Sequence, residues 1–420
     1  MKQLFKLIVA LSLLLAFGCQ PPSGNTSTPP DQVQVPFDSL QEESPVYVDT
    51  VINLPEEDNA ADPVIIPPVT EAPQEPIKPP VVEQPKPEVP VVKPPVMQPS
   101  AKILKDVVPF PLGAAIKYNQ FKKAGYLETV YREFKSVTPE NDLKIKSLQN
   151  AKGEFTFKEA DVMVNQLLAK GIRAHGHCLV WDAAVNDYFK DFKGTDKEFE
   201  AALKLYVQTV VKHFKGRVTS WDVLNEPFLD NGKGFKDKTF IKRIPDYHKK
   251  VFVWAHEADP SALLFMNDYN LQFTGVKSKA AVAWFKECQK EGIPVHGVGN
   301  QMHVSVKLDV AVFKKAIKMF TDLGLLYHIS ELEVKVFTPN PTPEQLAVQT
   351  EKYKDIFGAY QSVVPTKQQF GITTWGVSKP DWFENAAAGK GKWTDDPLLF
   401  GEGFSPSEAY KGLMSVYDSK

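Results

Sequence analysis

The sequence has 420 residues, of which 43% are hydrophobic, and a net charge of −2. This length allows two or three domains or one large barrel with extra segments, and the near-neutral charge argues against a protein whose main partner is DNA or RNA. Residues 21–100 differ from the rest, because they hold 20 of the 34 prolines, none of the seven tryptophans and a net charge of −10. The expected folded domain therefore lies after them, in a part of the chain with a net positive charge.

The first 18 residues are predicted to be a signal peptide of the lipoprotein type. Two lysines precede an apolar run over residues 7–17, which as a helix is too short to cross a membrane. The run ends in Leu-Ala-Phe-Gly-Cys, which resembles a bacterial lipobox, and Cys19 is the predicted lipidation site. The alternative is an ordinary cleaved signal with an incidental cysteine. We expect an exported protein held by its lipid on a bacterial membrane, and Gln20 favours the outer membrane.

Residues 19–101 are predicted to form an acidic, proline-rich, disordered linker. Each proline removes a backbone donor and pushes the residue before it toward extended geometry, so neither a helix nor a central strand can propagate. We expect extended polyproline II segments that hold the following domain away from the membrane. A proline-rich ligand for a partner domain is the alternative.

In residues 102–420 short apolar runs alternate with amphipathic stretches of helical period. Eight strand-like runs separated by helices favour an α/β fold of the (β/α)8 TIM-barrel type over a doubly wound sheet, since no G-x-G-x-x-G turn is present. The predicted strands are 112–116, 134–138, 172–180, 218–225, 262–267, 297–301, 326–331 and 371–375, and the predicted helices are 160–170, 199–214, 245–258, 277–291 and 310–323.

Polar residues recur where these strands end, which is where barrel enzymes carry their chemistry. Glu226 and Glu331 each close an apolar strand, and a carboxylate in such a place is costly unless it is hydrogen-bonded or paired. Two carboxylates on one rim suggest glycoside hydrolysis, in which one group protonates the departing oxygen and the other attacks or activates water. The alternative is that the two glutamates cap the helices that follow.

Seven strings at these strand ends resemble, in the right order, the family 10 glycoside hydrolases, the endo-β-1,4-xylanases. The resemblance covers residues 103–418, and 397–400 resembles the family's closing segment. The seven strings are Val137–Lys144, His175–Trp181, Trp221–Glu226, Leu264–Asn270, Gly297–His303, Ile329–Glu333 and Thr374–Val377.

The resemblance implies a retaining endo-β-1,4-xylanase, with Glu226 as acid/base and Glu331 as nucleophile about 5 to 5.5 Å apart. It also implies that Asn225 holds the sugar 2-hydroxyl, that His303, backed by Glu333, orients Glu331, and that Gln301 positions Glu226 or the sugar. The residues that it implies bind xylan or xylo-oligosaccharides are Glu140, Asn141, Lys144, His177, Trp181, Tyr269, Trp375 and Trp382.

Several positions depart from the family pattern. After Trp181 the family carries His, any residue and Gln, whereas this chain has Asp182, Ala183 and Ala184. We expect a changed preference or weaker binding on the non-reducing side of the cleavage point. Glu333 replaces the usual aspartate, and Trp382 stands one residue before the family's second tryptophan.

Other interpretations remain open from the sequence. The spacing of His175 and His177 also occurs in metal-dependent barrel hydrolases, which need further His, Lys and Asp ligands on later strands. The eighth strand offers Trp375 instead, so we expect no metal and no cofactor. A surface glycan-binding lipoprotein without catalysis is one alternative, and a related cellulase, mannanase or β-glucanase is another. We expect a monomer whose partners are a polysaccharide and, through the lipid, a membrane.

Overall fold

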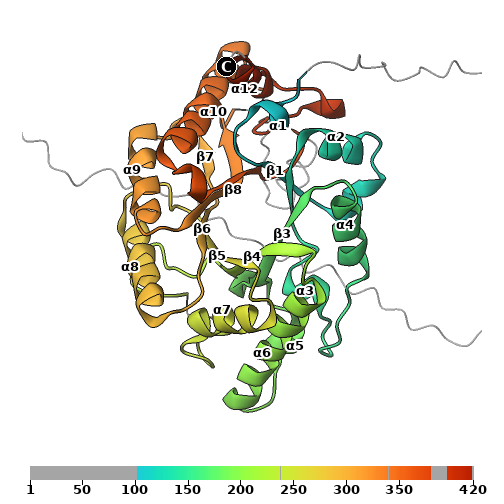
Figure 1. Cartoon of the computed structure of the whole chain (residues 1–420), viewed down its shortest axis with the longest axis vertical. Coiled ribbons are helices and arrows are strands. Elements are labelled where there is room, and N and C mark those ends of the chain that lie inside the picture. Colours follow the sequence, from blue (N-terminus) through green and yellow to red (C-terminus); the bar gives the residue numbers. More distant parts are fainter. Residues whose placement is uncertain (1–101, 237, 339, 380–394, 419–420) are drawn as a thin grey trace, which may run out of the picture. The chain divides into compact units, whose positions relative to one another are not determined.

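The computed structural model describes residues 102–236, 238–338, 340–379 and 395–418. In these ranges eight parallel strands form a ring surrounded by helices (Figure 1). The strand order is β6-β5-β4-β3-β2-β1-β9-β8, and the pairing of β6 with β8 closes the ring. The predicted (β/α)8 TIM barrel is therefore confirmed. The strands are β1 (Leu112–Ile116), β2 (Ser136–Pro139), β3 (Arg173–Val180), β4 (Val218–Asn225), β5 (Leu263–Asp268), β6 (Gly297–Asn300), β7 (His303–Ser305), β8 (Leu326–Lys335) and β9 (Gln369–Thr374).

The barrel strands coincide with the predicted ones within two residues at most ends, but β8 is longer. Its last residues, beyond the predicted end at 331, pair in parallel with the short strand β7, so that His303 stands opposite Glu333. β7 is an addition at the carboxyl rim, and among the described strands it pairs with β8 alone. This extension brings residues 331–335 alongside His303.

The helices of the ring form where apolar residues recur at helical spacing. α6 begins with a capping box, in which Thr195 and Glu198 bond each other's backbone N–H groups, and α10 begins with the equivalent pair Thr342 and Gln345. The sequence did not predict the longer helices α2, α10 and α12, nor the four-residue helices α1, α3 and α5. The α-helices are α1 (Leu104–Val107), α2 (Tyr126–Glu133), α3 (Ile145–Leu148), α4 (Lys158–Leu168), α5 (Asp187–Lys190), α6 (Asp196–His213), α7 (Tyr247–Ala258), α8 (Val276–Glu291), α9 (Val310–Thr321), α10 (Pro343–Val363) and α12 (Glu408–Tyr417). Short 3-10 helices are η1 (Tyr118–Lys122), η2 (Asp182–Ala184), η3 (Thr366–Gln368) and η4 (Glu402–Phe404).

Close packing of β3 on β4 fixes the part of the rim that carries Glu226. Trp221 in β4 is fully buried, and its ring lies against Gly176 in β3. A Cβ on Gly176 would approach the Trp221 ring to 2.1 Å, so only glycine fits there. The close approach holds His177 and the end of β4 in one register.

Several predictions fall outside the described residues. These are the signal peptide over 1–18, the lipidation site Cys19, the linker over 19–101 and the sugar contact of Trp382. Among the residues that are described, no helix is both long and apolar enough to span a membrane.

Candidate active site

Glu226 follows the last residue of β4 and has a left-handed backbone, with φ of 49°. Its backbone N–H donates to the Asn267 carbonyl at 2.8 Å, which fixes the turn. Its carboxylate accepts a hydrogen bond from Gln301 Nε2 at 3.1 Å and lies 3.4 Å from Lys236 Nζ. The side chain is 18% exposed, so it is held by neighbours and remains open to a substrate.

Glu331 lies within β8 and is more deeply placed, with a side chain that is 6% exposed. Its Oε1 accepts a hydrogen bond from Asn267 Nδ2 at 2.7 Å, and its Oε2 lies 3.0 Å from His303 Nε2. Its backbone N–H donates to the Gln301 carbonyl at 2.9 Å. Both carboxylate oxygens therefore have a donor, which removes rotational freedom from the group.

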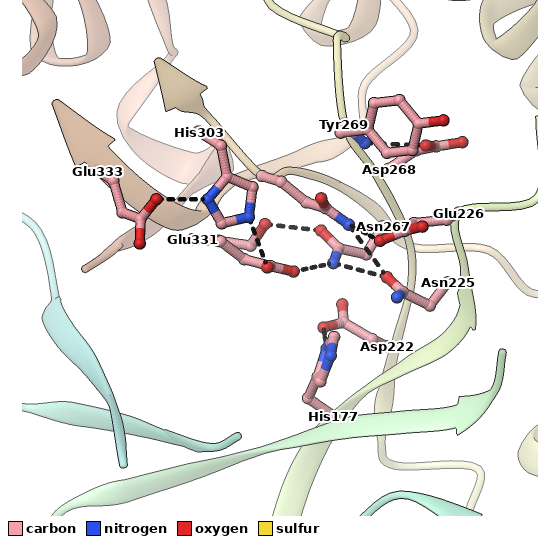
Figure 2. Close-up of polar contacts among 12 residues, drawn as sticks. His177, Asp222, Asn225, Glu226, Asn267, Asp268, Tyr269, His303, Glu331 and Glu333 are labelled. Atoms are coloured by element: carbon pink, nitrogen blue, oxygen red, sulfur yellow. Dashed lines mark hydrogen bonds and ion pairs between the residues drawn. The ribbon is translucent and has the colours of Figure 1, made fainter. Parts of the chain in front are cut away.

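Side-chain amides connect the two carboxylates (Figure 2). Asn267 Nδ2 donates to Asn225 Oδ1 at 2.9 Å as well as to Glu331, and Ser330 Oγ donates to Asn267 Oδ1 at 2.6 Å. Gln301 Nε2 lies 3.4 Å from Asn225 Oδ1 and completes the connection to Glu226. Asn225, Asn267 and Gln301 are thus one amide network that touches both carboxylates.

Asn267 was not assigned a role from the sequence, although it stands in one of the seven family-like strings. It is fully buried near the end of β5, and Gly299 in β6 leaves the space for it, since a Cβ there would come within 2.2 Å of Asn267 Oδ1. The sequence signal that could have identified Asn267 is a polar residue directly after the apolar run 263–266.

His303 lies between two glutamates, as predicted. Its Nε2 faces Glu331 and its Nδ1 lies 3.0 Å from Glu333 Oε2. Burial lowers the pKa of His303, but the hydrogen bonds to the two glutamates outweigh it and raise the pKa to about 9. The imidazole is therefore a cation at neutral pH and can donate to both carboxylates.

Four predicted sugar-binding residues contact one another on the side of the rim formed after β2 and β3. Lys144 Nζ lies 4.7 Å from the centre of the Trp181 ring and 3.2 Å from Asn141 Oδ1. Asn141 Nδ2 donates to Glu140 Oε1 at 3.2 Å, and Glu140 also pairs with Lys117 at 3.7 Å. The group offers charged and amide side chains next to an aromatic face, which suits a polyhydroxylated ligand.

His177 and Trp375 meet edge to face, with ring centres 5.4 Å apart. Trp375 also lies edge to face with His303 at 6.3 Å. His177 Nδ1 bonds Asp222 Oδ2 at 2.9 Å, and Asp222 lies 3.1 Å from His175 Nε2. Burial raises the pKa of Asp222, but the two histidines reverse this and hold it below its usual range. Asp222 thus fixes the orientation of His177 toward the Trp375 ring.

Tyr269 lies on the acid/base side of the site among charged groups that the sequence did not assign. Lys277 Nζ lies 3.2 Å from the centre of its ring and Lys236 Nζ 4.9 Å from it. Lys277 also pairs with the fully buried Asp268 at 2.8 Å and with Asp230 at 3.0 Å. Burial raises the pKa of Asp268 to about 6, despite the lysines beside it.

Asp182 does not extend freely toward the site. Its Oδ1 accepts a hydrogen bond from the backbone N–H of Thr239 at 3.0 Å, in the loop between β4 and α7. Burial raises the pKa of Asp182, and Ala184 is buried as well. Of the two positions that depart from the family pattern, Asp182 therefore bonds the loop at Thr239, and Ala184 packs in the interior.

Within the described ranges no group of three or more His, Cys, Asp or Glu side chains is arranged to hold a metal ion. What the site does offer is a pair of carboxylates on different strands, with amide donors around them, a cationic imidazole behind one and an ammonium beside the other. Such a pair can supply an acid and a nucleophile to one glycosidic bond.

The chain is similar to known xylanases and to a named exoglucanase. Over 349 residues it is 34% identical to endo-beta-1,4-xylanase Xyn10C of Cellvibrio japonicus, covering 74% of this chain and 57% of that protein. It is 32% identical over 328 residues to exoglucanase XynX of Acetivibrio thermocellus, covering 74% of this chain but 29% of that one. The chain thus spans less than two thirds of the length of either relative.

A solved structure, xylanase 10B from Thermotoga petrophila RKU-1 in complex with xylobiose, matches with a TM-score of 0.69 and 30% identity, covering 75% of this chain and 96% of that one. The model of glycosyl hydrolase family 10 matches residues 101–416. On these matches, and with a TIM barrel that carries two glutamates at its rim, the chain belongs to glycosyl hydrolase family 10.

Proposed function

We propose that this chain is a retaining endo-β-1,4-xylanase that cleaves internal bonds of xylan by double displacement. The observation that carries the proposal is the amide network of Asn225, Asn267 and Gln301, which joins Glu226 and Glu331 on one rim. Family membership and xylanase-named relatives at 30 to 34% identity support the same activity.

In the first step Glu331 attacks the anomeric carbon while Glu226 donates its proton to the departing glycosidic oxygen. The bond from the anomeric carbon to that oxygen breaks, and a bond to a Glu331 carboxylate oxygen forms. His303 and Asn267 hold one oxygen of Glu331 each, so the attacking group enters the reaction in a fixed orientation.

In the second step Glu226, now a carboxylate, takes a proton from a water molecule, which attacks the same carbon and releases the sugar from Glu331. Lys236 and Gln301 each contact one oxygen of Glu226 and so hold it in place for both roles. Two inversions at one carbon return the original configuration, so the product keeps the β-anomeric form.

Asn225 is assigned to the 2-hydroxyl of the reacting sugar, since its Oδ1 already accepts from Asn267 and its amide nitrogen remains available to a hydroxyl oxygen. Sugars on the non-reducing side are assigned to Glu140, Asn141, Lys144, His177 and Trp181, with Trp375 beneath the reacting ring. Tyr269 is assigned to the opposite side of the cleavage point. Trp382 remains a proposed contact.

We also propose an altered preference on the non-reducing side, because Asp182 and Ala184 replace two polar family residues. The engagement of Asp182 with the loop at Thr239 supports this, since that carboxylate is already used. Comparable cleavage rates for linear xylo-oligosaccharides by wild type and by an Asp182→His, Ala184→Gln double variant would contradict it.

The activity is tested by incubating the full chain with xylan, arabinoxylan, β-glucan and mannan and following new reducing ends. We expect release from the xylans, and loss of at least about 10³-fold in Glu331→Gln and Glu226→Gln. Asn165→Ala, on the outer helix α4, is the matched control and should keep wild-type release. Binding to xylan without release would instead favour a glycan-binding protein without catalysis.

A β-glucanase is the second candidate, and one observation favours it: the exoglucanase-named relative shares 32% identity with this chain. A xylose unit lacks the 6-hydroxymethyl group of glucose. A β-glucanase therefore needs more space beside the reacting ring than a xylanase does. Faster release of reducing ends from β-glucan than from xylan would select this candidate.

We further propose that the enzyme is exported and anchored through a lipid on Cys19, on the outer membrane, with residues 19–101 as a linker. The lipobox-like string before Cys19 and the proline content of the segment after it support this. Incorporation of labelled palmitate into the wild type, its absence in Cys19→Ala, and membrane fractionation test the proposal.

The enzyme is proposed to act as a monomer, because one barrel supplies both glutamates together with the donors that hold them. A sedimentation experiment at micromolar concentration tests this, and a mass of twice the chain mass of 47.0 kDa would contradict it.

A further inference from the structure

Beyond the two proposed catalytic glutamates, β8 carries an extended row of charged side chains. Successive residues of a strand alternate between its two faces, so Glu331, Glu333 and Lys335 share one face of β8. His303 from the neighbouring β7 stands between the two glutamates, 3.0 Å from each. Lys335 Nζ lies 2.9 Å from Glu333 Oε2. We call Glu331, His303, Glu333 and Lys335 the charge row.

The members of the charge row alternate in sign and are largely removed from water. The side chains of Glu331, Glu333 and Lys335 are 6%, 5% and 17% exposed, and that of His303 is 25% exposed. Lys335 and His303 bind the same oxygen of Glu333, so this oxygen receives two cationic donors. With Lys335 at its end, the row has two negative and two positive groups.

Glu333 is the member whose charge depends most on Lys335. Burial raises the pKa of Glu333, while Lys335, followed by His303, opposes this and brings the pKa down to about 2. Among the described residues, the other ionisable groups that interact with this part of the charge row are Tyr353 of α10, whose pKa burial raises well above its usual value, and Asp395, which lies close to Lys335. Neither is a cation, so within the described part of the chain the positive charges on Glu333 come from His303 and Lys335.

We propose that Lys335 is a positioning residue for the nucleophile of the reaction proposed above, acting through Glu333 and His303 on Glu331. Lys335 keeps Glu333 ionised and directed at His303 Nδ1. His303 then keeps both its N–H groups engaged and presents Nε2–H to Glu331. The extra methylene of Glu333, where the family has aspartate, brings its carboxylate to Lys335. The inference rests on the proposed function for its effect on catalysis, but not for the electrostatics of the row.

Removal of Lys335 should raise the pKa of Glu333. In the wild type Glu333 becomes protonated only as pH falls through about 2. Without Lys335, its nearest cation, Glu333 becomes protonated at a higher pH. A protonated Glu333 no longer attracts the His303 cation, which releases the imidazole from its place between the glutamates. Turnover should therefore fail first at acidic pH.

The test compares Lys335→Met, Lys335→Arg and Lys307→Met in the full chain. Methionine keeps the length of the side chain without its charge, arginine keeps the charge, and Lys307 is an exposed lysine just after β7 that serves as the matched control. The pH profile of kcat/KM on an aryl β-xylobioside is the first measurement, with melting curves to verify folding.

We expect the acidic limb of Lys335→Met to move up by about one pH unit, which is about a tenfold loss on that limb, with the alkaline limb in place. Lys335→Arg should restore the profile, and Lys307→Met should keep it. A wild-type profile in Lys335→Met, or an equal loss at every pH in both Lys335 variants, would overturn the proposal.

A second measurement does not need activity. Carboxyl carbon-13 NMR titration of glutamate-labelled protein follows Glu333 directly, with Glu333→Gln assigning its signal. The pKa of Glu333 should rise in Lys335→Met and stay low in Lys335→Arg. An unchanged Glu333 titration overturns the inference, whereas a raised pKa in a protein that does not cleave xylosides supports the charge row and contradicts the proposed function alone.

Discussion

The carboxylate of Asp182 accepts a hydrogen bond from the backbone N–H of Thr239 at 3.0 Å, and so joins the end of β3 to the loop between β4 and α7. The sequence pointed to Asp182 only as a missing sugar contact. In the fold it is a loop anchor next to Lys236 and Lys238, both of which oppose the rise in its pKa.

Asp182→Ala should loosen this loop. The change leaves the Thr239 N–H without its acceptor, and the loss of one such bond to a carboxylate costs about 1.5 to 3 kcal/mol. We expect a lower melting temperature and a higher KM for xylo-oligosaccharides, because Lys236 on the same loop contacts Glu226. Asp187→Ala, at an exposed aspartate of α5, is the control and should melt like the wild type. An unchanged melting temperature in Asp182→Ala would show that the loop does not depend on this bond.

Asn267→Ala should reduce kcat on xylan by about 10- to 100-fold, the value of a hydrogen bond to a charged group. It removes the donor to Glu331 Oε1 and at the same time the nearer of the two amide donors to Asn225 Oδ1. Rates are measured by reducing-end release, and Asn165→Ala on α4 is the matched control. Activity within a factor of two of the wild type would contradict the role of the amide network.

The loss of protein stability at alkaline pH should follow the deprotonation of His303. Its pKa is raised to about 9, so the imidazolium is present at neutral pH and is lost as pH rises through about 9. The stability that the imidazolium contributes is complete below the ordinary histidine pKa of 6.5 and is lost as pH rises through about 9. We expect the free energy of unfolding to fall between pH 7 and 9.5. A His303→Gln variant should lack this part of the stability profile, and a wild-type profile in that variant would exclude His303 as its source.

Gly176→Ala should destabilise the barrel, because the new Cβ would lie 2.1 Å from the Trp221 ring and β3 would have to move away from β4. Overpacking of this kind costs about 1 to 3 kcal/mol. Gly358→Ala, inside α10 with nothing within 4 Å of the new Cβ, is the same substitution and should instead stabilise by about 0.5 to 1 kcal/mol. Urea unfolding compares the two, and equal effects would contradict the packing argument.

The sequence was sufficient to predict the barrel because its buried parallel strands are short, mostly apolar runs separated by amphipathic helices, so each strand can be recognised by itself. The sequence also predicted the location of the site, since polar residues at the carboxyl ends of parallel strands, such as Asn225 and Gln301, all lie at one edge of the barrel. α10 was missed because its buried residues include Gln349 and Thr350, which weaken the apolar pattern.

Beyond the contacts that the family resemblance implied, pairings between distant residues were not predictable. Asn267 meets Glu331 across 64 residues of sequence, and Asp182 meets Thr239 across 57. Lys335 was missed because the predicted strand ended at 331, before the stretch that pairs with β7. Each of these depends on side-chain direction and register at the rim, which a local pattern does not carry.

The most direct test of the account is covalent trapping of the nucleophile. An activated 2-deoxy-2-fluoro-β-xylobioside reacts in the first step and is released slowly in the second, so the glycosyl-enzyme accumulates. Peptide mass spectrometry of the treated full chain should find one fluoroxylobiosyl group on Glu331, and none in Glu331→Gln. A label on Glu226 or on any other residue would contradict the assignment on which the mechanism depends.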